Sequence, residues 1–577
     1  MSVSSLMDVL TNNPAIILTV GAAVTLAAPR HLASLILLIA TGLSAIKLYA
    51  LGLGEYGAVS LIGEELTTVR LDPLSRIFAV VFHIAAALNI IYAWGQRDRA
   101  QNFASLAYPA AALGGVLAGD LITLFFWWEV AAITSVFLVW APGTRATFVA
   151  GMRYLSIQIL SGVLLLAGIV LLYRETGSLA FEAIGLRDES GALRLSAMVM
   201  FLAFGIKSAF PLFHNWVQDA YPKSTITGAI VLSIFTTKLA VYSLARGFLG
   251  TPELIYIGAV MTIFPIFFAL IENDLRKVLT YSINNQVGFM VCAIGLGSLN
   301  GAAGYAFGNI IFEGLLFMAL GAAMYRTGTS KATELGGLYR TMPITMGLCI
   351  IGALSISAFP GTLGFVTKGL IIDAAGEAHM LWIWLVLLFA SAGVLEHAGI
   401  KIPFFTFFAH DSGKRPKEAP LGMLIAMSIA AILCVGIGLV PGPLYALLPD
   451  QAQIADYHPY SAYHVVEQLQ LLFWAILAFA VLIVFKWYPA EVPSTNLDFD
   501  WLYRVPGRAL LGWAAGASGA TWVALWGIFT DRLQAILARV YVVHGPEGQL
   551  ARSWPIGFMA LTTAILLGFV LLLAFLA

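Results

Sequence analysis

Long apolar runs follow one another along almost the whole chain, and they constrain its fold more than any other feature. Each has about the length that an α-helix needs to cross a bilayer. Of the 577 residues, 60% are apolar and 11% are charged, whereas soluble domains are about 45–50% apolar and about 25% charged. We therefore predict an all-α, polytopic membrane protein. The runs lie at about 14–28, 31–50, 74–95, 104–119, 121–140, 149–173, 195–221, 224–248, 254–271, 277–298, 302–325, 342–375, 381–409, 420–447, 466–487 and 555–577.

Charge balance and cysteine spacing exclude several classes of function. The 31 Lys and Arg match the 31 Asp and Glu, so no strong basic field exists to attract nucleic acid. The three cysteines, Cys292, Cys349 and Cys434, lie alone in apolar runs, which excludes a cysteine-held zinc or iron–sulfur centre. The chain has no phosphate-binding GxxxxGK[ST] motif, so we expect neither ATP hydrolysis nor a cofactor.

Basic residues collect in alternate loops and predict the orientation of the chain. With the N-terminus outside, the inside loops are rich in Lys and Arg and the outside loops are poor in them, which supports this orientation for the first fourteen spans. Stretch 509–541 fits either an interfacial helix or a further span, so the side of the C-terminus stays open. We expect a multi-pass protein of the bacterial inner membrane. The inside loops hold Arg30, Arg97, Arg99, Arg145, Lys223, Arg276, Lys277, Arg326, Lys331, Arg340, Lys414, Arg415 and Lys417.

Two predicted spans contain a helix-breaking proline. Pro211 interrupts span 195–221, and Pro360 interrupts span 342–375. Each break lies close to one lysine, Lys207 or Lys368. The two spans are five segments apart, so the surrounding segments would cross the membrane in opposite senses. This pattern is typical of the inverted repeats of secondary transporters, whose sites lie at broken helices near the midplane.

Ionisable side chains recur in the middle of the apolar runs, where each costs roughly 2.5–3.5 kcal/mol or more at the helix centre. Such residues usually mark a polar path through the bilayer. Alternatively, Glu129 only pairs with a lysine and locks two helices together. The alternative for His214 is a histidine at a helix end whose hydrogen bonds are satisfied and which has no role in transport. Arg246 is expected to snorkel to the interface. The candidate residues for proton translocation are Glu129, Lys207, His214, Lys238, Glu313, Lys368, Glu396 and His397.

Burial suggests how such residues would carry a proton. Lys207, Pro211 and His214 are spaced by four and seven, which predicts one helix face. Burial disfavours the charged form of a lysine, and a nearby carboxylate favours it. Moving or neutralising Glu129 would then switch the proton affinity of Lys207. Lysines bridged by water or histidine would relay the proton onward, without a metal or a nucleophile.

Several motifs match one known family. Residues 205–219, GIKSAFPLFHNWVQD, closely resemble the signature helix of the proton-translocating antiporter-like subunits of respiratory complex I and Mrp-type Na⁺/H⁺ antiporters. The FFWWE run that ends at Glu129 is similar to the fifth-helix glutamate motif of that family. The resemblance covers roughly residues 70–410, and the region from Glu418 looks most like the D-type subunit of Mrp antiporters. Further similarity lies in DLRKVLTYS at 274–282, LGGL at 335–338 and SISAFPGTLGFVTK at 355–368.

The resemblance implies a fold of about fourteen core helices with two inverted five-helix repeats that contain broken helices, followed by extension helices. Each repeat would form one proton half-channel. The implied regions are N-terminal transmembrane helices at 1–103, a first repeat at 104–248, a second repeat at 254–409, C-terminal transmembrane helices at 420–487, and an extension at 488–577 with a possible interfacial helix and a final transmembrane helix.

The resemblance also implies roles for single residues. Glu129 and Lys207 would form the controlling ion pair, Lys238 and Lys368 would continue the path, and His214 would gate entry. The eleventh helix departs from the family pattern, because Asn309 and Glu313 replace its histidine and its relay lysine. Glu313 could relay protons and favour the charged forms of Lys238 and Lys368, or it could block transfer by trapping a salt bridge. Glu396, His397 and Lys401 could compensate for the missing histidine and relay lysine of the eleventh helix.

Three functions follow as hypotheses. The leading one is the proton-translocating subunit of a multisubunit Mrp-type cation/proton antiporter, moving H⁺ in exchange for Na⁺. The second is an ion-pumping membrane-arm subunit of a redox complex, of the NADH:quinone oxidoreductase or membrane-bound hydrogenase type. The third is a scaffold subunit that does not transport. All three place the chain in the lipid bilayer among other subunits and none makes it an enzyme by itself.

Overall fold

The computed structural model describes residues 11–61, 63–188, 190–488, 492, 496–544 and 556–576. A helical bundle ends at Asn496, and a second unit begins at Leu497. Ten of the described helices are long and apolar enough to cross a membrane, which agrees with a polytopic membrane protein.

The bundle follows the predicted order of spans. Capping residues in the connecting loops set many of the helix starts, as at Asp120, whose carboxylate accepts from the Thr123 N–H at 2.7 Å. The helices are α2 (Pro14–Ala27), α3 (Ala33–Ala50), α4 (Pro73–Tyr92), α5 (Arg99–Leu117), α6 (Leu121–Trp140), α7 (Arg145–Thr176), α8 (Leu195–Lys207), α9 (Asn215–Ala220), α10 (Ile226–Gly247), α11 (Pro252–Ile271), α12 (Leu275–Gly295), α13 (Leu299–Thr327), α14 (Pro343–Ile356), α15 (Leu363–Glu377), α16 (Leu381–Val394), α17 (Lys401–Pro403), α18 (Leu421–Leu439), α19 (Gly442–Tyr445), α20 (Gln451–Ile454) and α21 (Ala462–Val484).

A β-hairpin occupies the first loop that the sequence placed outside. Strands β1 (Gly54–Leu61) and β2 (Glu64–Leu71) pair antiparallel, with Gly54 opposite Leu71 and Leu61 opposite Glu64. In β2 the side chains of Leu66, Val69 and Leu71 are buried. The expectation of an all-α chain missed this element, because its apolar positions are few and its acidic residues suggest a solvated loop.

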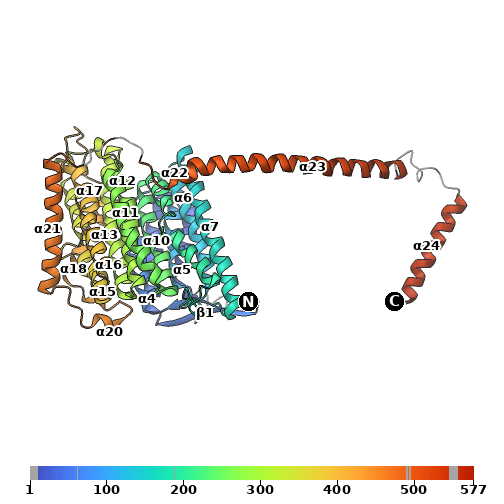
Figure 1. Ribbon diagram of the computed structural model, residues 1–577, viewed down its shortest axis with the longest axis horizontal. Helices are drawn as coiled ribbons and strands as arrows, with labels where there is room; N and C mark the ends of the chain where they lie inside the picture. The colour runs from blue at the N-terminus through green and yellow to red at the C-terminus, as the bar shows by residue number, and fades with distance from the viewer. Residues whose placement is uncertain are drawn as a thin grey trace. The chain divides into compact units, whose positions relative to one another are not determined.

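The most buried helices lie in the middle of the bundle. Helices α10 and α13 are buried along nearly all of their apolar length, whereas α3, α7 and α21 leave most of theirs uncovered. Helix α13 packs on α4, α10, α12, α14, α15 and α18. Figure 1 shows α10, α12 and α13 between α7 on one side and α21 on the other. The charged side chains of Lys238 on α10 and Glu313 on α13 are therefore enclosed by neighbouring helices.

Both predicted helix breaks are present. Helix α8 ends at Lys207, and the left-handed Ala209 (φ 61°) and Leu212 (φ 76°) separate it from α9. Because the chain leaves the helix here, the prediction that Lys207, Pro211 and His214 share one helix face is wrong. At the second break Ala358 (φ 57°) separates α14 from α15.

Glycine allows the second break to close. Gly364, in the first turn of α15, lies against the carbonyl oxygen of Ser355 in α14 so tightly that a Cβ would collide with it. The two half-helices therefore meet backbone to backbone, which brings the end of α14 close to the side chains of α15.

From Asp500 onward, the described residues of the second unit are helical. It contains α22 (Asp500–Leu502), the π-helix η7 (Tyr503–Gly507), α23 (Arg508–His544) and α24 (Ile556–Leu576). Stretch 509–541 lies within the single 37-residue helix α23. Helix α23 is not among the ten candidate spans found in the described residues, and the choice between an interfacial helix and a further span stays a prediction.

Candidate functional site

Lys207 lies at the first helix break and is almost wholly buried. Its ammonium group donates to the carbonyl oxygen of Trp128 in α6 at 2.7 Å. The same nitrogen lies 4.1 Å from the centroid of the Trp128 ring. A carbonyl and an aromatic face stabilise the cation while leaving no carboxylate in direct contact with it. The lysine is therefore held by neutral groups.

Glu129 follows Trp128 and is half-buried. Its Oε1 is buried and has no hydrogen-bond partner, and it lies over Gly162 of α7, where a Cβ would collide with it. Across the residues that the structure describes, no ion pair joins Glu129 to Lys207, although the two charges still interact electrostatically. The direct ion pair between Glu129 and Lys207 that the family resemblance implies is therefore not formed in this structure.

His214 stands immediately before α9 and is 1% exposed. Its ring packs on Phe264 of α11, with ring centroids 4.7 Å apart. The structure thus places His214 on the far side of the break from Lys207, against a different helix. Its predicted gating role stays a prediction.

Lys238 and Glu313 form an ion pair in the most buried part of the bundle. Lys238 Nζ of α10 lies 3.5 Å from Glu313 Oε2 of α13, and both side chains are almost fully buried. Lys238 also donates to the carbonyl oxygen of Ser233 at 2.9 Å. Glu313 Oε1 and both amide atoms of Asn309 lack hydrogen-bond partners. Buried polar atoms without protein partners usually bind water, so this pair adjoins groups suited to a hydrated gap.

Lys368 lies at the second helix break, in α15. Its ammonium group donates to the carbonyl oxygen of Ile356, the last residue of α14, at 3.0 Å. The carbonyl end of a helix carries partial negative charge, which attracts a cation. Lys368 Nζ also lies 5.1 Å from the Phe289 ring centroid and 5.8 Å from that of Tyr305. As at Lys207, the direct partners are a carbonyl and aromatic faces.

The residues after α16 form a π-helix, η5 (Leu395–Ile400). His397 is fully buried, and its Nδ1 lies 2.6 Å from the carbonyl oxygen of Gly393. Lys401 donates to the carbonyl oxygens of Ala269 and Leu270 at the end of α11, at 3.2 and 2.7 Å. Glu396 is half-buried and forms no ion pair with any residue that the structure describes. The π-helix η5 and Lys401 therefore lie beside α11.

The sequence analysis missed a row of buried amides on α12. Asn285, Gln286 and Tyr305 are fully buried. The Tyr305 hydroxyl donates to Gln286 Oε1, and Gln286 Nε2 donates to Asn285 Oδ1 at 2.9 Å. Since Lys368 faces the Tyr305 ring, this hydrogen-bonded row ends beside the second break. Three amides in succession in an apolar run, Asn284 to Gln286, were the signal available in the sequence.

Arg246, in the last turn of α10, pairs with a carboxylate of the loop that precedes α4. Its guanidinium donates to both carboxylate oxygens of Asp72, at 2.9 and 2.7 Å, and to the Tyr242 hydroxyl at 2.8 Å. Burial raises the pKa of Asp72, but Arg246 and the Ser75 contacts outweigh it and hold this pKa below its usual value. The loop after β2 thus supplies Arg246 with a partner that helix spacing could not reveal, and its reach to the interface stays a prediction.

Comparison with known proteins identifies the region that carries most of these residues. A family model described as "NADH:quinone oxidoreductase/Mrp antiporter, TM" matches residues 118–393. The A-type subunit of the Na⁺/H⁺ antiporter of Alkalihalophilus pseudofirmus is 29% identical over 437 residues, which are 67% of this chain and 54% of that relative. Hydrogenase-4 component B of Escherichia coli is 26% identical over 417 residues, 64% of this chain and 62% of that relative. The match spans only about half to three fifths of the length of these two relatives.

Two solved structures share the fold. A chain of the Mrp complex from Dietzia sp. has a TM-score of 0.69 at 21% identity and covers 82% of this chain and 100% of that chain. A chain of the membrane-bound sulfane sulfur reductase, an archaeal respiratory membrane complex, has a TM-score of 0.68 at 22% identity and covers 97% of this chain and 99% of that chain. Residues 118–393 therefore resemble the transmembrane domain described by the NADH:quinone oxidoreductase/Mrp antiporter family model, and the chain shares the fold of the two solved structures.

Proposed function

We propose that this chain is the proton-translocating subunit of a multisubunit Mrp-type cation/proton antiporter in a bacterial inner membrane. The observation that carries the proposal is the placement of Lys207, Lys238, Glu313 and Lys368, all buried, on core helices with two breaks. Charges at such depth persist where they serve a pathway. Residues 104–248 and 254–409 would form the two inverted repeats, and the resemblance around Glu418 favours the position of the D-type subunit.

Sodium-driven proton movement in everted vesicles tests this proposal. Vesicles that contain the complete complex and an acidified interior should lose their pH gradient when NaCl is added. Vesicles from a strain that lacks only this chain should keep it. The pH gradient across the vesicle membrane is measured with a pH-sensitive dye. Addition of KCl at the same ionic strength controls for salt effects. A sodium response that survives loss of the chain would refute the assignment.

A redox-driven complex is the second candidate. The sulfane sulfur reductase chain covers nearly all of this chain, and Hydrogenase-4 component B is among its relatives. Purification of the intact complex distinguishes the two functions. Flavin or iron–sulfur subunits in the preparation would favour the redox complex, and only small membrane subunits would favour the antiporter.

Gly162→Ala should impair transport without changing a charged residue. Its Cβ would collide with Glu129 Oε1 and turn this carboxylate away from its place beside α7. Because small displacements of reacting groups cost large factors, we expect the transport rate to fall by about tenfold or more. Gly436→Ala in α18 is the matched control, since its Cβ would meet nothing within 4 Å. Equal rates in both variants would contradict the role of Glu129.

A further inference from the structure

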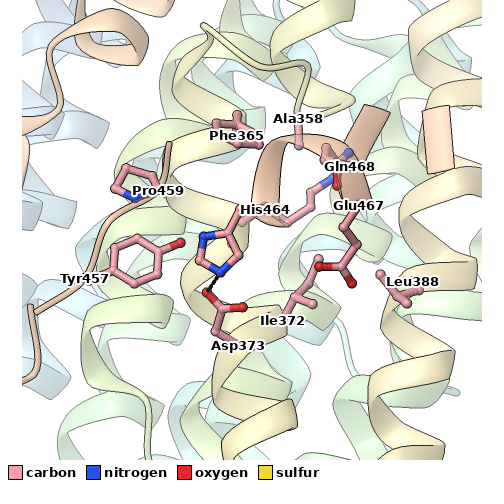
Figure 2. A pocket seen from close by; sticks show the side chains of 12 residues that line it. Ala358, Phe365, Ile372, Asp373, Leu388, Tyr457, Pro459, His464, Glu467 and Gln468 are labelled. Atoms are coloured by element: carbon pink, nitrogen blue, oxygen red, sulfur yellow. Dashed lines mark ion pairs between the residues drawn. The ribbon is translucent and has the colours of Figure 1, made fainter. Parts of the chain in front are cut away.

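A small cavity beside Lys368 is lined largely by residues outside the candidate set. It lies between α15, the loop after α20 and the start of α21, and Figure 2 shows the side chains around it. Its volume of about 30 Å³ is enough for one or two water molecules. The ionisable and amide side chains that line it are Lys368, Asp373, Tyr457, His464, Glu467 and Gln468.

An ion pair joins the two helices that border the cavity. His464 Nε2 of α21 lies 3.3 Å from Asp373 Oδ2 of α15, as the dashed line in Figure 2 marks. The Tyr457 ring lies 5.8 Å from the His464 ring, centroid to centroid. Glu377 also acts electrostatically on Asp373 from α15. The contact between His464 and Asp373 therefore joins α21 to α15 at the edge of the cavity.

The next turn of α21 brings a second carboxylate to the cavity. Glu467 Oε1 is buried and lacks a hydrogen-bond partner. Beside it, Gln468 donates to the carbonyl oxygen of Ser357 at 3.2 Å, in the break that also holds Lys368. Helix α21 is thus anchored at the break and presents Glu467 to the cavity that Lys368 lines.

This cavity lies toward the end of the bundle that the loop charges predict to be outside. Figure 1 shows α15 and α20 toward the same end of the bundle as β1. The hairpin formed by β1 and β2 is the first predicted outside loop. A proton that leaves Lys368 through the cavity would therefore approach the outer surface.

We propose that α21 supplies the outer end of the proton path, with Glu467 as the acceptor of the proton from Lys368 and the His464–Asp373 ion pair as its gate. An N–H bond of the Lys368 ammonium breaks, and an O–H bond forms on the Glu467 carboxylate through cavity water. Lysine and glutamate are then both neutral. When the ion pair opens, Glu467 gives the proton to outside water and becomes a carboxylate again. This inference rests on the proposed function, and α21 lies beyond the matched residues 118–393.

Substitutions in α21 test the inference in vesicles that contain the assembled complex. Glu467→Gln should lower the rate of proton transport by about tenfold or more, because the amide cannot accept the proton, whereas Glu467→Asp should keep most of the rate. His464→Gln removes one partner of the ion pair with Asp373 and should therefore change how the rate depends on outside pH. His31→Gln, at an exposed position between α2 and α3, should leave both the rate and the pH profile unchanged.

The outcomes separate this inference from the proposed function. A wild-type rate in Glu467→Gln, or an unchanged pH profile in His464→Gln, overturns the role of α21. If Lys207→Ala also transports at the wild-type rate, the proposed function itself fails. A Glu467→Gln complex that does not assemble leaves the pH profile of His464→Gln to decide, because a purely structural contact would not shift that profile.

Discussion

Replacement of Lys207 by alanine is expected to abolish proton transport while the complex still assembles. The ammonium group is the only charge at the first break that contacts α6, through the Trp128 carbonyl and ring, in the part of the chain that the structure describes. Without it, Glu129 loses the lysine that acts on it, and the first break has no ammonium group to hold the proton. Positioned proton-transfer groups typically contribute about 10²–10⁴-fold, so we expect a loss of at least about 100-fold.

Lys331→Ala is the control for this experiment. Lys331 lies on the surface and pairs with the exposed Glu334, at 3.7 Å, and such pairs contribute little to stability. The amount of assembled complex should be equal in both variants, and the dye signal should be lost only in Lys207→Ala. Wild-type transport by a triple variant at Glu129, Lys207 and Lys368 would instead support the scaffold hypothesis.

The sequence predicted those features that depend on local chemistry. Apolar length defined the spans, and proline together with a nearby lysine marked both breaks, so the predicted positions at Pro211 and Pro360 agree with the ends of α8 and α14. Burial of the charged residues followed from their place in apolar runs. These signals are readable because each involves residues close together in the chain.

Ion pairs between residues that lie far apart in the chain could not be predicted from the sequence. Asp72 binds Arg246 from 174 residues away, and His464 binds Asp373 from a helix outside the matched domain. Helix periodicity gives the direction of a side chain and leaves its neighbour on another helix undetermined. For the same reason the sequence could not decide whether Glu129 or a carbonyl would hold Lys207.

Glu313→Leu is expected to destabilise the assembled complex and to stop transport. The substitution leaves the Lys238 ammonium buried without the carboxylate 3.5 Å away. Breaking one side of a buried ion pair typically costs about 3–5 kcal/mol, whereas replacing both partners with apolar residues is often neutral. The double variant Lys238→Met, Glu313→Leu should therefore recover the melting temperature of the detergent-solubilised complex and still fail to transport.

Recovery of stability with or without recovery of transport shows whether the Lys238–Glu313 pair carries the proton or only holds two helices together. If the Lys238–Glu313 pair only fastens α10 to α13, the double variant regains both stability and transport. If the pair carries the proton, stability returns and transport does not, because apolar side chains offer no site for a proton at the centre of the bundle. Glu313→Lys adds a third arm, since a second ammonium beside Lys238 replaces attraction by repulsion. A larger loss of stability in Glu313→Lys than in Glu313→Leu would show that the attraction between the two charges holds Lys238 in place.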